Sequence, residues 1–304
     1  MEYVVTTSAL SKKYGKANAL EELEIHIPKG SVYGLVGRNG AGKTTLIRII
    51  CGLQEQTGGE YTIYGVPSGE AGISAVRRRI GAVIETPAVY PDMTAEENLR
   101  EQAMLHGLPS YESIPDILKL VGLYDTGRKK ARNFSLGMKQ RLGIAIALVG
   151  TPDFIVLDEP INGLDPKGIV EMRELILRLN RERGITVLIS SHILGELSKL
   201  ATHYGFIEKG YLLKEMSAAE LEAACRKCVC VEVSDASVLA RTLDAMALDY
   251  EITSENTAKI YGKISVSELV RALDKENCEL ISLREQGENL EAYFINLVGG
   301  EQNA

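Results

Sequence analysis

The stretch from Gly37 to Thr45 constrains this chain more than any other, because it reads GRNGAGKTT and fits the pattern G-x-x-x-x-G-K-[ST]. The apolar run 31–36 before it is typical of a strand, and the run 46–50 after it predicts the start of a helix. Strand, loop and helix in this order are the context in which the pattern binds phosphate. The alternative is a glycine-rich turn without a ligand, and the matching context disfavours it.

Glycine lets backbone N–H groups and the positive end of a helix approach an anion closely. We therefore expect a nucleoside triphosphate in this loop, with Lys43 at its β- and γ-phosphates and the Thr44 hydroxyl on Mg²⁺. The other residues of the loop that we expect to contact the nucleotide are Gly37, Asn39, Gly40, Ala41, Gly42 and Thr45.

A second apolar run, 154–157, ends in two carboxylates, Asp158 and Glu159. At the end of a strand beside the phosphate loop, Asp158 would hold Mg²⁺ and Glu159 would polarise the attacking water as a general base. A third run, 186–190, is followed by His192, which we expect at the γ-phosphate. The alternatives are a solvated acidic turn for the carboxylates and a structural role for the histidine.

The bulk composition narrows the class of protein. The chain has 304 residues, 45% of them hydrophobic, and a net charge of −7, which argues against a dedicated nucleic-acid-binding protein. We expect no secretory signal, because the start of the sequence has neither a basic segment nor a long apolar segment after it. We expect no membrane span, because no apolar run is long enough to cross a bilayer. If the protein works at a membrane, another chain must supply the spans.

The chain has five cysteines, which form no even disulfide framework, and a nucleotide site implies the reducing cytosol. Cys225, Cys228 and Cys230 could be read as a metal cluster, but a second ligand pair at zinc spacing is missing. Small thiols in a strand are the simpler interpretation.

The pattern of elements predicts an α/β fold in two domains, 1–224 and 225–304. Strands and helices alternate in the first, which favours a mostly parallel sheet, and Thr94 to Glu97 fits a capping box that opens a helix. A helical stretch is expected over 110–130. The tail predicts a small α+β domain of the order β-α-β-β-α-β, followed by a last helix over 288–298.

These pieces occur in the order found in ABC-type ATPases. The stretch 133–141, NFSLGMKQR, resembles the ABC signature, 161–165 resembles the D-loop, His192 the switch histidine, and Tyr14 the aromatic that stacks on adenine. The resemblance covers residues 3 to 220. It implies a P-loop NTPase of RecA-like fold, an ABC cassette with a helical and an antiparallel β subdomain.

Within the signature, Ser135 can cap a helix, while Gly137 keeps backbone amides near the helix end open to an anion. In the ABC family this motif contacts the γ-phosphate that is bound to the other subunit. One phosphate loop and one signature therefore cannot complete a site, and the resemblance implies a second nucleotide-binding subunit, which we expect to be a copy of this chain.

The chain departs from the common ABC pattern at Leu136, Met138 and Glu85. Leu136 and Met138 put side-chain contacts to the nucleotide in doubt. Glu85 stands where most ABC proteins carry the glutamine that touches Mg²⁺ and relays to the transport partner. We expect Glu85 near the metal and the reacting phosphate, and a solvent-exposed carboxylate at a strand end is the alternative.

The segment 84–91, the signature and the tail 288–294 resemble bacterial bacitracin-resistance and lantibiotic-immunity exporters. The resemblance implies a cytoplasmic ATPase on the inner face of the membrane, driving a separate permease, with 87–90 as the permease-contact surface. It implies export of, or immunity to, a peptide antibiotic. The alternative is a soluble ABC ATPase without a transport role, either ribosome-associated or a regulatory ATP-binding module.

Overall fold

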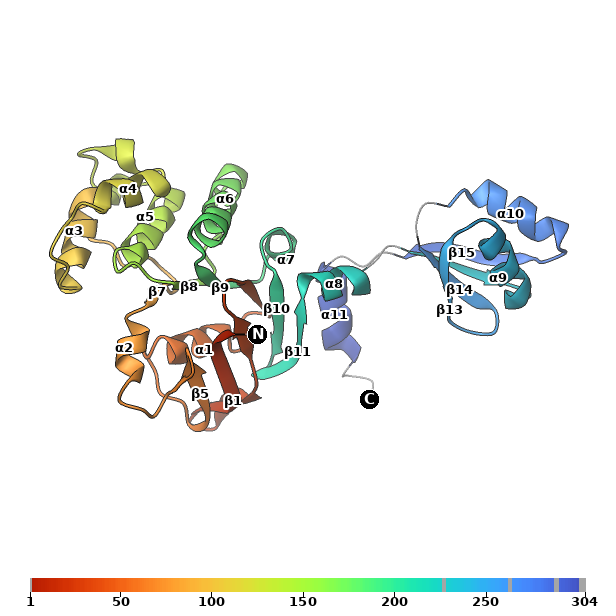
Figure 1. Cartoon of the computed structure of the whole chain (residues 1–304), viewed down its shortest axis with the longest axis horizontal. Coiled ribbons are helices and arrows are strands. Elements are labelled where there is room, and N and C mark those ends of the chain that lie inside the picture. The colour runs from red at the N-terminus through yellow and green to blue at the C-terminus, as the bar shows by residue number, and fades with distance from the viewer. Residues whose placement is uncertain (1, 226–227, 262–263, 287–289, 301–304) are drawn as a thin grey trace. The chain divides into compact units, whose positions relative to one another are not determined.

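The computed structural model of the protein describes residues 2–225, 228–261, 264–286 and 290–300. The chain forms two compact units, Met1–Ala218 and Ala219–Ala304 (Figure 1). The division falls at the start of helix α8 (Ala218–Ala224), whereas the sequence pattern had placed it after this helix. Among the described residues, no helix is long and apolar enough to cross a membrane.

The first unit is built on a six-stranded sheet in the order β11-β10-β4-β9-β8-β7. All neighbouring pairs are parallel except β10 with β11, so the predicted mostly parallel sheet is confirmed. Its strands are β4 (Val32–Val36), β7 (Ile80–Val83), β8 (Phe154–Asp158), β9 (Thr186–Ser191), β10 (His203–Glu208) and β11 (Tyr211–Ser217).

The central strands of this sheet are buried along their whole length, as expected for parallel strands covered on both faces. Helices α1 (Lys43–Ile50) and α6 (Pro166–Arg183) follow β4 and β8. Because the carboxyl ends of parallel strands meet at one edge, the segments after β4, β8 and β9 converge there. This edge carries the site described below.

An antiparallel sheet packs beside the core and matches the antiparallel β subdomain that the resemblance implied. Its strand order is β2-β1-β5-β6, and β3 also pairs with β1. The predicted turn at Tyr14 joins β1 to β2 through Gly15, whose φ of +59° favours glycine. The strands are β1 (Tyr3–Tyr14), β2 (Ala17–Leu23), β3 (His26–Pro28), β5 (Gly58–Ile63) and β6 (Val66–Pro67).

Helices α3, α4 and α5 pack on one another and form the helical subdomain (Figure 1). The prediction of a helical stretch over 110–130 is only partly correct, because the helical structure there is limited to α4 and the short η1. Gly122 and Gly127 have positive φ values of 68° and 51°, which end these turns. The elements of this part are α3 (Ala95–Leu105), α4 (Ile114–Leu120), η1 (Tyr124–Thr126), η2 (Ala131–Asn133) and α5 (Leu136–Leu148). Helix α2 (Ile73–Arg77) contacts β5 and β6 instead, and α7 (Leu194–Leu197) follows β9.

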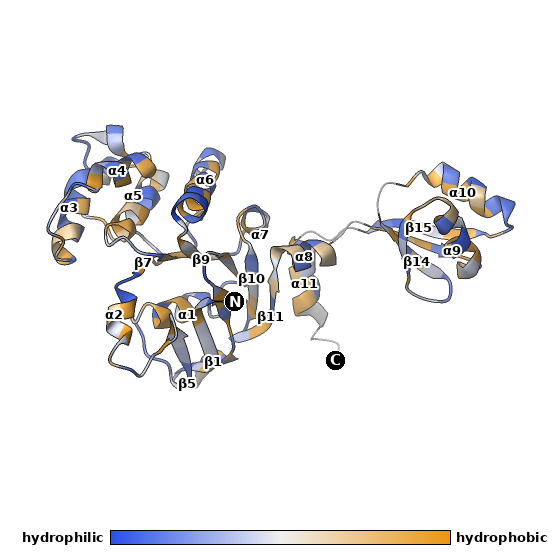
Figure 2. Cartoon of the chain, in the orientation of Figure 1, coloured by the Kyte–Doolittle hydropathy of each residue, from blue (hydrophilic) through white to orange (hydrophobic). Residues whose placement is uncertain are grey.

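The second unit contains a four-stranded antiparallel sheet in the order β13-β14-β12-β15 with α9 and α10 packed together. The predicted β-α-β-β-α-β order is confirmed. Figure 2 shows apolar and polar residues alternating along α10, whose Leu269 and Leu273 are buried in the core. The elements are β12 (Cys228–Val233), α9 (Ala236–Ala245), β13 (Asp249–Ile252), β14 (Thr257–Tyr261), α10 (Val266–Lys275), β15 (Leu280–Gln286) and α11 (Leu290–Gly300).

Two cysteines of the second unit lie in strand β12, in agreement with the simpler interpretation of the cysteine spacing. Cys228 and Cys230 alternate with Val229 and Val231, which enter the apolar core of this unit. In the described part of the chain, no group of three or more His, Cys, Asp or Glu side chains is placed to hold a metal ion. The first two residues of the tail segment, Glu288 and Asn289, lie outside the described residues.

The predicted capping box at the start of α3 is confirmed and provides a test of the fold. The Thr94 hydroxyl accepts from the Glu97 N–H at 3.1 Å, and the Glu97 carboxylate accepts from the Thr94 N–H at 2.6 Å. This N–H and the Lys130 ammonium lower the pKa of Glu97 to about 2. Because the box satisfies two backbone donors, we expect Thr94→Ala to lower the free energy of unfolding by about 1 kcal/mol.

Urea unfolding of the two proteins measures this loss. Ser113→Ala is the matched control, because Ser113 stands at the same position before α4 and makes no capping hydrogen bond with its side chain. Equal effects of the two substitutions would contradict a specific role for the box.

Candidate functional site

The loop between β4 and α1 has a backbone that only glycine tolerates at its key positions. Gly42 has a φ of +112°, and a Cβ atom there would lie 2.6 Å from the carbonyl oxygen of Ala19. A Cβ on Gly37 would lie 2.5 Å from the carbonyl oxygen of Ile207. At Gly40, with φ +81°, a Cβ would meet no atom within 4 Å, so the loop faces open space there. The loop thus offers backbone N–H groups and room for an anion.

Lys43 begins α1 and folds back onto this loop. Its ammonium donates to the carbonyl oxygens of Gly37 at 2.7 Å and Arg38 at 3.2 Å, and lies 3.3 Å from Glu159 Oε1. Its side chain is 6% exposed. A buried cation is therefore held in the concavity of the phosphate loop, where a phosphate oxygen can replace the carbonyl and carboxylate oxygens.

Asp158 ends β8 and joins two hydroxyls from neighbouring elements. The Thr44 hydroxyl donates to Asp158 Oδ2 at 2.8 Å, and the Ser190 hydroxyl donates to Asp158 Oδ1 at 2.5 Å. Asp158 is almost fully buried. A carboxylate and a hydroxyl are hard oxygen donors of the kind that Mg²⁺ prefers, so the residues present fit this ion.

Ser190 was missed from the sequence. Besides binding Asp158, its hydroxyl accepts from the Glu159 N–H at 2.9 Å. The signal that could have found it is its place as the polar last residue of the apolar run 186–190, in the strand that pairs with β8.

Glu159 and His192 lie together at the same edge of the sheet. The His192 Nδ1 atom is 2.7 Å from Glu159 Oε2, and the His192 N–H donates weakly to the same oxygen at 3.4 Å. Glu159 Oε1 is buried without a hydrogen bond among the described residues, although the Lys43 ammonium is nearby. Glu159 itself has a φ of +51°, a strained left-handed conformation. Residues with such strained backbones are often found at active sites. One carboxylate oxygen is thus bound to His192, while the other is paired by charge with Lys43 and accepts no hydrogen bond among the described residues.

Tyr14 lies at the end of β1 with 45% of its surface exposed. Its hydroxyl donates to Gln54 Oε1 at 2.5 Å, and the Lys12 ammonium is 5.4 Å from its ring centre. The hydroxyl is therefore tethered, which fixes the ring at the surface. Its stacking on adenine stays a prediction.

The signature residues line a cavity of their own. Ser135 caps α5 by accepting from the Met138 N–H at 3.3 Å, and Leu136 next to it is 47% exposed. A cavity of about 360 Å³ opens in front of these residues, and no residue of the phosphate loop lines it. Its lining comes from the signature, the D-loop and the start of α6: Ser135, Leu136, Gly137, Arg141, Gly163, Leu164, Asp165, Lys167, Gly168 and Glu171.

Glu85 follows strand β7 by two residues and forms an ion pair with helix α1. Arg48 on α1 donates to Glu85 Oε1 at 2.7 Å, and the Glu85 side chain is 58% exposed. Its φ is +59°, so its backbone is strained as well. Among the described residues, its side-chain partner is Arg48 and not Thr44 or Asp158. Contact of Glu85 with the metal stays a prediction.

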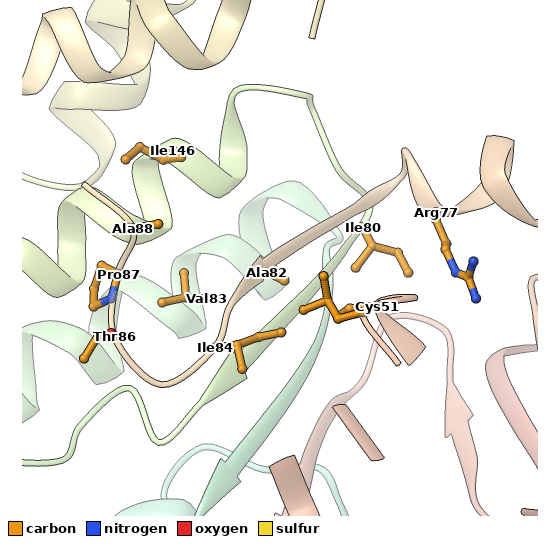
Figure 3. A pocket seen from close by; sticks show the side chains of 12 residues that line it. Cys51, Arg77, Ile80, Ala82, Val83, Ile84, Thr86, Pro87, Ala88 and Ile146 are labelled. Atoms are coloured by element: carbon orange, nitrogen blue, oxygen red, sulfur yellow. The ribbon is translucent and has the colours of Figure 1, made fainter. Parts of the chain in front are cut away.

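A mostly apolar groove of about 360 Å³ follows the strand that leads to Glu85 (Figure 3). Burial raises the pKa of the Cys51 thiol in its wall to about 12, so this side chain acts as an apolar surface. Pro87 approaches α5 so closely that a Cβ on Gly143 would lie 2.7 Å from it. The lining residues are Cys51, Leu53, Arg77, Ile80, Ala82, Val83, Ile84, Thr86, Pro87, Ala88, Gly143 and Ile146.

The comparisons with known proteins agree with this geometry. The sequence model of the ABC transporter family matches residues 20–162. The chain is 39% identical to the bacitracin transport ATP-binding protein BcrA of Enterococcus faecalis, over 99% of this chain and 98% of that one. It is 43% identical to the lantibiotic transport ATP-binding protein SrtF of Streptococcus pyogenes, over 68% of this chain and 87% of that one.

Solved structures of ATP-binding cassettes are similar to a large part of this chain. The dimeric post-hydrolysis state of the ATP-binding cassette MJ0796, bound to ADP and Pi, has a TM-score of 0.63 at 26% identity, covering 70% of this chain and 98% of that one. An ATP-binding subunit of an ABC transporter has a TM-score of 0.64 at 29% identity, covering 73% of this chain and 92% of that one.

Proposed function

The chain belongs to the family of ABC transporter ATP-binding proteins, and on this basis we propose that it powers an exporter that protects the cell from a peptide antibiotic. The observation that carries the proposal is the match to a bacitracin transport ATP-binding protein over 99% of this chain. That match continues through the second unit, whereas the match to the lantibiotic transport protein covers 68% of the chain.

The chain is an ATPase, and we assign the steps of hydrolysis to its side chains as follows. Lys43 leaves the loop carbonyls and binds the β- and γ-phosphates, while Glu159 accepts a proton from the attacking water. His192 holds the Glu159 carboxylate through its Nδ1 atom and faces the γ-phosphate from the same edge. Thr44 and Asp158 would hold Mg²⁺, which neutralises phosphate charge when it is bound.

A second copy of the chain completes the site in this proposal. Asp158 and Glu159 contact the start of helix α1 at the phosphate loop, and His192 contacts Glu159. Ser135 and Gly137 line a different cavity, which has no lining residue from the phosphate loop. A helix start that borders a cavity suits an anion that another subunit brings. The dimeric form of the similar cassette MJ0796 supports this arrangement.

The groove of Figure 3 is our candidate for the permease contact. It has the apolar lining that a partner helix requires, and it is walled by Thr86, Pro87 and Ala88, directly after Glu85. Leu53, one of its lining residues, is 68% exposed and adds apolar surface to this wall. The ATPase would thus sit at the inner face of the membrane through its permease.

Antibiotic resistance tests this function. We would express the chain together with a membrane permease subunit in a bacitracin-sensitive bacterium and measure the minimal inhibitory concentrations of bacitracin and a lantibiotic. We expect a rise for at least one of them, lost in Glu159→Gln and retained in Glu60→Gln, which changes an exposed carboxylate on β5. An active ATPase that raises neither concentration would favour the soluble alternative, which acts on ribosomes or as a regulatory module.

A further inference from the structure

Near its end, strand β9 carries a buried hydroxyl that contacts two residues of the site. Ser190 lies directly opposite Asp158 in the parallel pairing of β9 with β8, and 0% of its surface is exposed. Its hydroxyl donates to Asp158 Oδ1 at 2.5 Å and accepts from the Glu159 N–H at 2.9 Å. A serine hydroxyl can donate its proton and accept a hydrogen bond at the same time. Ser190 therefore joins the residue proposed for the metal to the residue proposed as the base.

The contact with Ser190 gives the Asp158 carboxylate one orientation. Asp158 Oδ1 is bound to Ser190, and Oδ2 accepts from the Thr44 hydroxyl at 2.8 Å, so each oxygen has a partner on a different element. Without the Ser190 hydroxyl, Oδ1 would be a buried oxygen that has lost this partner, and the carboxylate would be free to turn. The hydroxyl thus keeps Oδ2 beside Thr44, at the position proposed for Mg²⁺.

The same hydroxyl helps to hold the strained backbone of Glu159. A non-glycine residue keeps a φ of +51° only when its surroundings fix it. The Glu159 N–H donates to the hydroxyl oxygen of Ser190 at 2.9 Å and to the carbonyl oxygen of Ser190 at 3.2 Å. At the other end of the residue, His192 Nδ1 is 2.7 Å from Glu159 Oε2. Strand β9 and the histidine that follows it therefore hold both the backbone and the carboxylate of Glu159.

We propose that Ser190 is a positioning residue for ATP hydrolysis, and that its hydroxyl fixes the Asp158 carboxylate and the Glu159 backbone as one unit. Because its side chain is buried, Ser190 touches neither ATP nor the attacking water and acts through these two residues. The inference rests on the roles proposed above for Asp158 and Glu159. Loss of the hydroxyl slows the chemical step and leaves the phosphate loop able to bind ATP.

The first test compares two buried hydroxyls of the same strand. Ser190→Ala removes the hydroxyl with little change in volume. At saturating Mg²⁺ we expect kcat to fall about 10- to 100-fold, the range for one lost hydrogen bond to a charged group, and KM for ATP to change less than about twofold. The matched control is Thr186→Val at the start of β9, where the buried Thr186 hydroxyl accepts from the Gly30 N–H at 2.9 Å. We expect Thr186→Val to keep the normal kcat.

Further measurements separate positioning from a general loss of structure. Urea unfolding checks that each variant is folded, and Ser190→Cys is a second variant of similar size, whose weakly donating thiol should give a kcat between those of serine and alanine. In the nucleotide-free protein, we expect the Glu159 amide to exchange its hydrogen faster in Ser190→Ala and at the normal rate in Thr186→Val.

The two carboxylates are then tested separately in a Glu159→Gln protein. Single-turnover hydrolysis at saturating Mg²⁺ should be slowed much less by Ser190→Ala in this protein, because residues that act as a unit are not additive. A fluorescent ATP analogue reports binding, and we expect Ser190→Ala to raise the Mg²⁺ concentration for half-maximal binding, since Asp158 loses its fixed orientation.

The proposal is overturned if Ser190→Ala keeps the normal kcat, or if Thr186→Val lowers kcat as much, since the effect then follows the stability of the strand. It is also overturned if the full effect of Ser190→Ala persists in the Glu159→Gln protein. A Glu159→Gln protein of normal activity would overturn the proposed base and this inference together. A normal Ser190→Ala protein beside an inactive Glu159→Gln protein would overturn this inference alone.

Discussion

Replacing Glu159 with glutamine is expected to slow ATP hydrolysis by about 10²- to 10⁴-fold, the usual contribution of a positioned general base. Glutamine keeps the shape of the side chain, and its amide oxygen can still accept hydrogen bonds from His192. It cannot, however, accept a proton from water. The Lys43 ammonium and the loop amides remain, so ATP should still bind. Phosphate release measures the first effect, and a fluorescent ATP analogue measures the second.

The control for this substitution is Glu60→Gln, an exposed change on β5 that should leave turnover unaffected. Loss of binding together with loss of turnover would mean that Glu159 holds the nucleotide site together through Lys43, at 3.3 Å, and is not primarily the base. Unchanged turnover would refute the role of Glu159 altogether.

Replacing Ser135 with arginine is expected to lower turnover by about 10²-fold or more, although Ser135 lies outside the site that holds ATP in its own chain. The arginine would fill the cavity of about 360 Å³ in front of the signature, where we place the γ-phosphate bound to a second copy. Binding of ATP to the phosphate loop should be preserved. Turnover and binding are measured as for Glu159→Gln.

Ser135→Arg also removes the cap of α5, so a second variant separates blocking from unfolding. Leu136→Arg keeps the cap and places the same cation at the same cavity, since Leu136 is 47% exposed and lines it. We expect the same loss of turnover. A Leu136→Arg protein that hydrolyses ATP at the normal rate would show that the cavity is not used in the reaction.

The sequence predicted most strands and helices of this fold well, because each of them depends on residues that are close together in the chain. The buried strands β4, β8 and β9 show as apolar runs, and the loop before α1 shows as glycines that the backbone requires. The capping box of α3 follows from two residues three positions apart. In the helical region, however, Gly122 and Gly127 ended helices that the polar periodicity favoured.

The side-chain contacts of the site could not be predicted in the same way, because they join residues far apart in the chain. Arg48 and Glu85 are 37 positions apart, and Ser190 lies 32 positions after Asp158. The left-handed backbone of Glu85 and Glu159 also leaves no mark in a single sequence, since glutamate rarely adopts it. The motif order predicted that Asp158 and Glu159 lie beside the phosphate loop, and the structure adds their contacts with Thr44 and Lys43.

The central claim is that ATP is held between two copies, by the phosphate loop of one and the signature of the other. Light scattering of the purified Glu159→Gln protein tests this most directly, with and without Mg²⁺ and ATP. We predict that the molar mass doubles when ATP is added, and that Ser135→Arg or Leu136→Arg in the same protein prevents the doubling. A mass that stays that of a single chain while ATP is bound, or a doubling that survives both arginines, would contradict the claim.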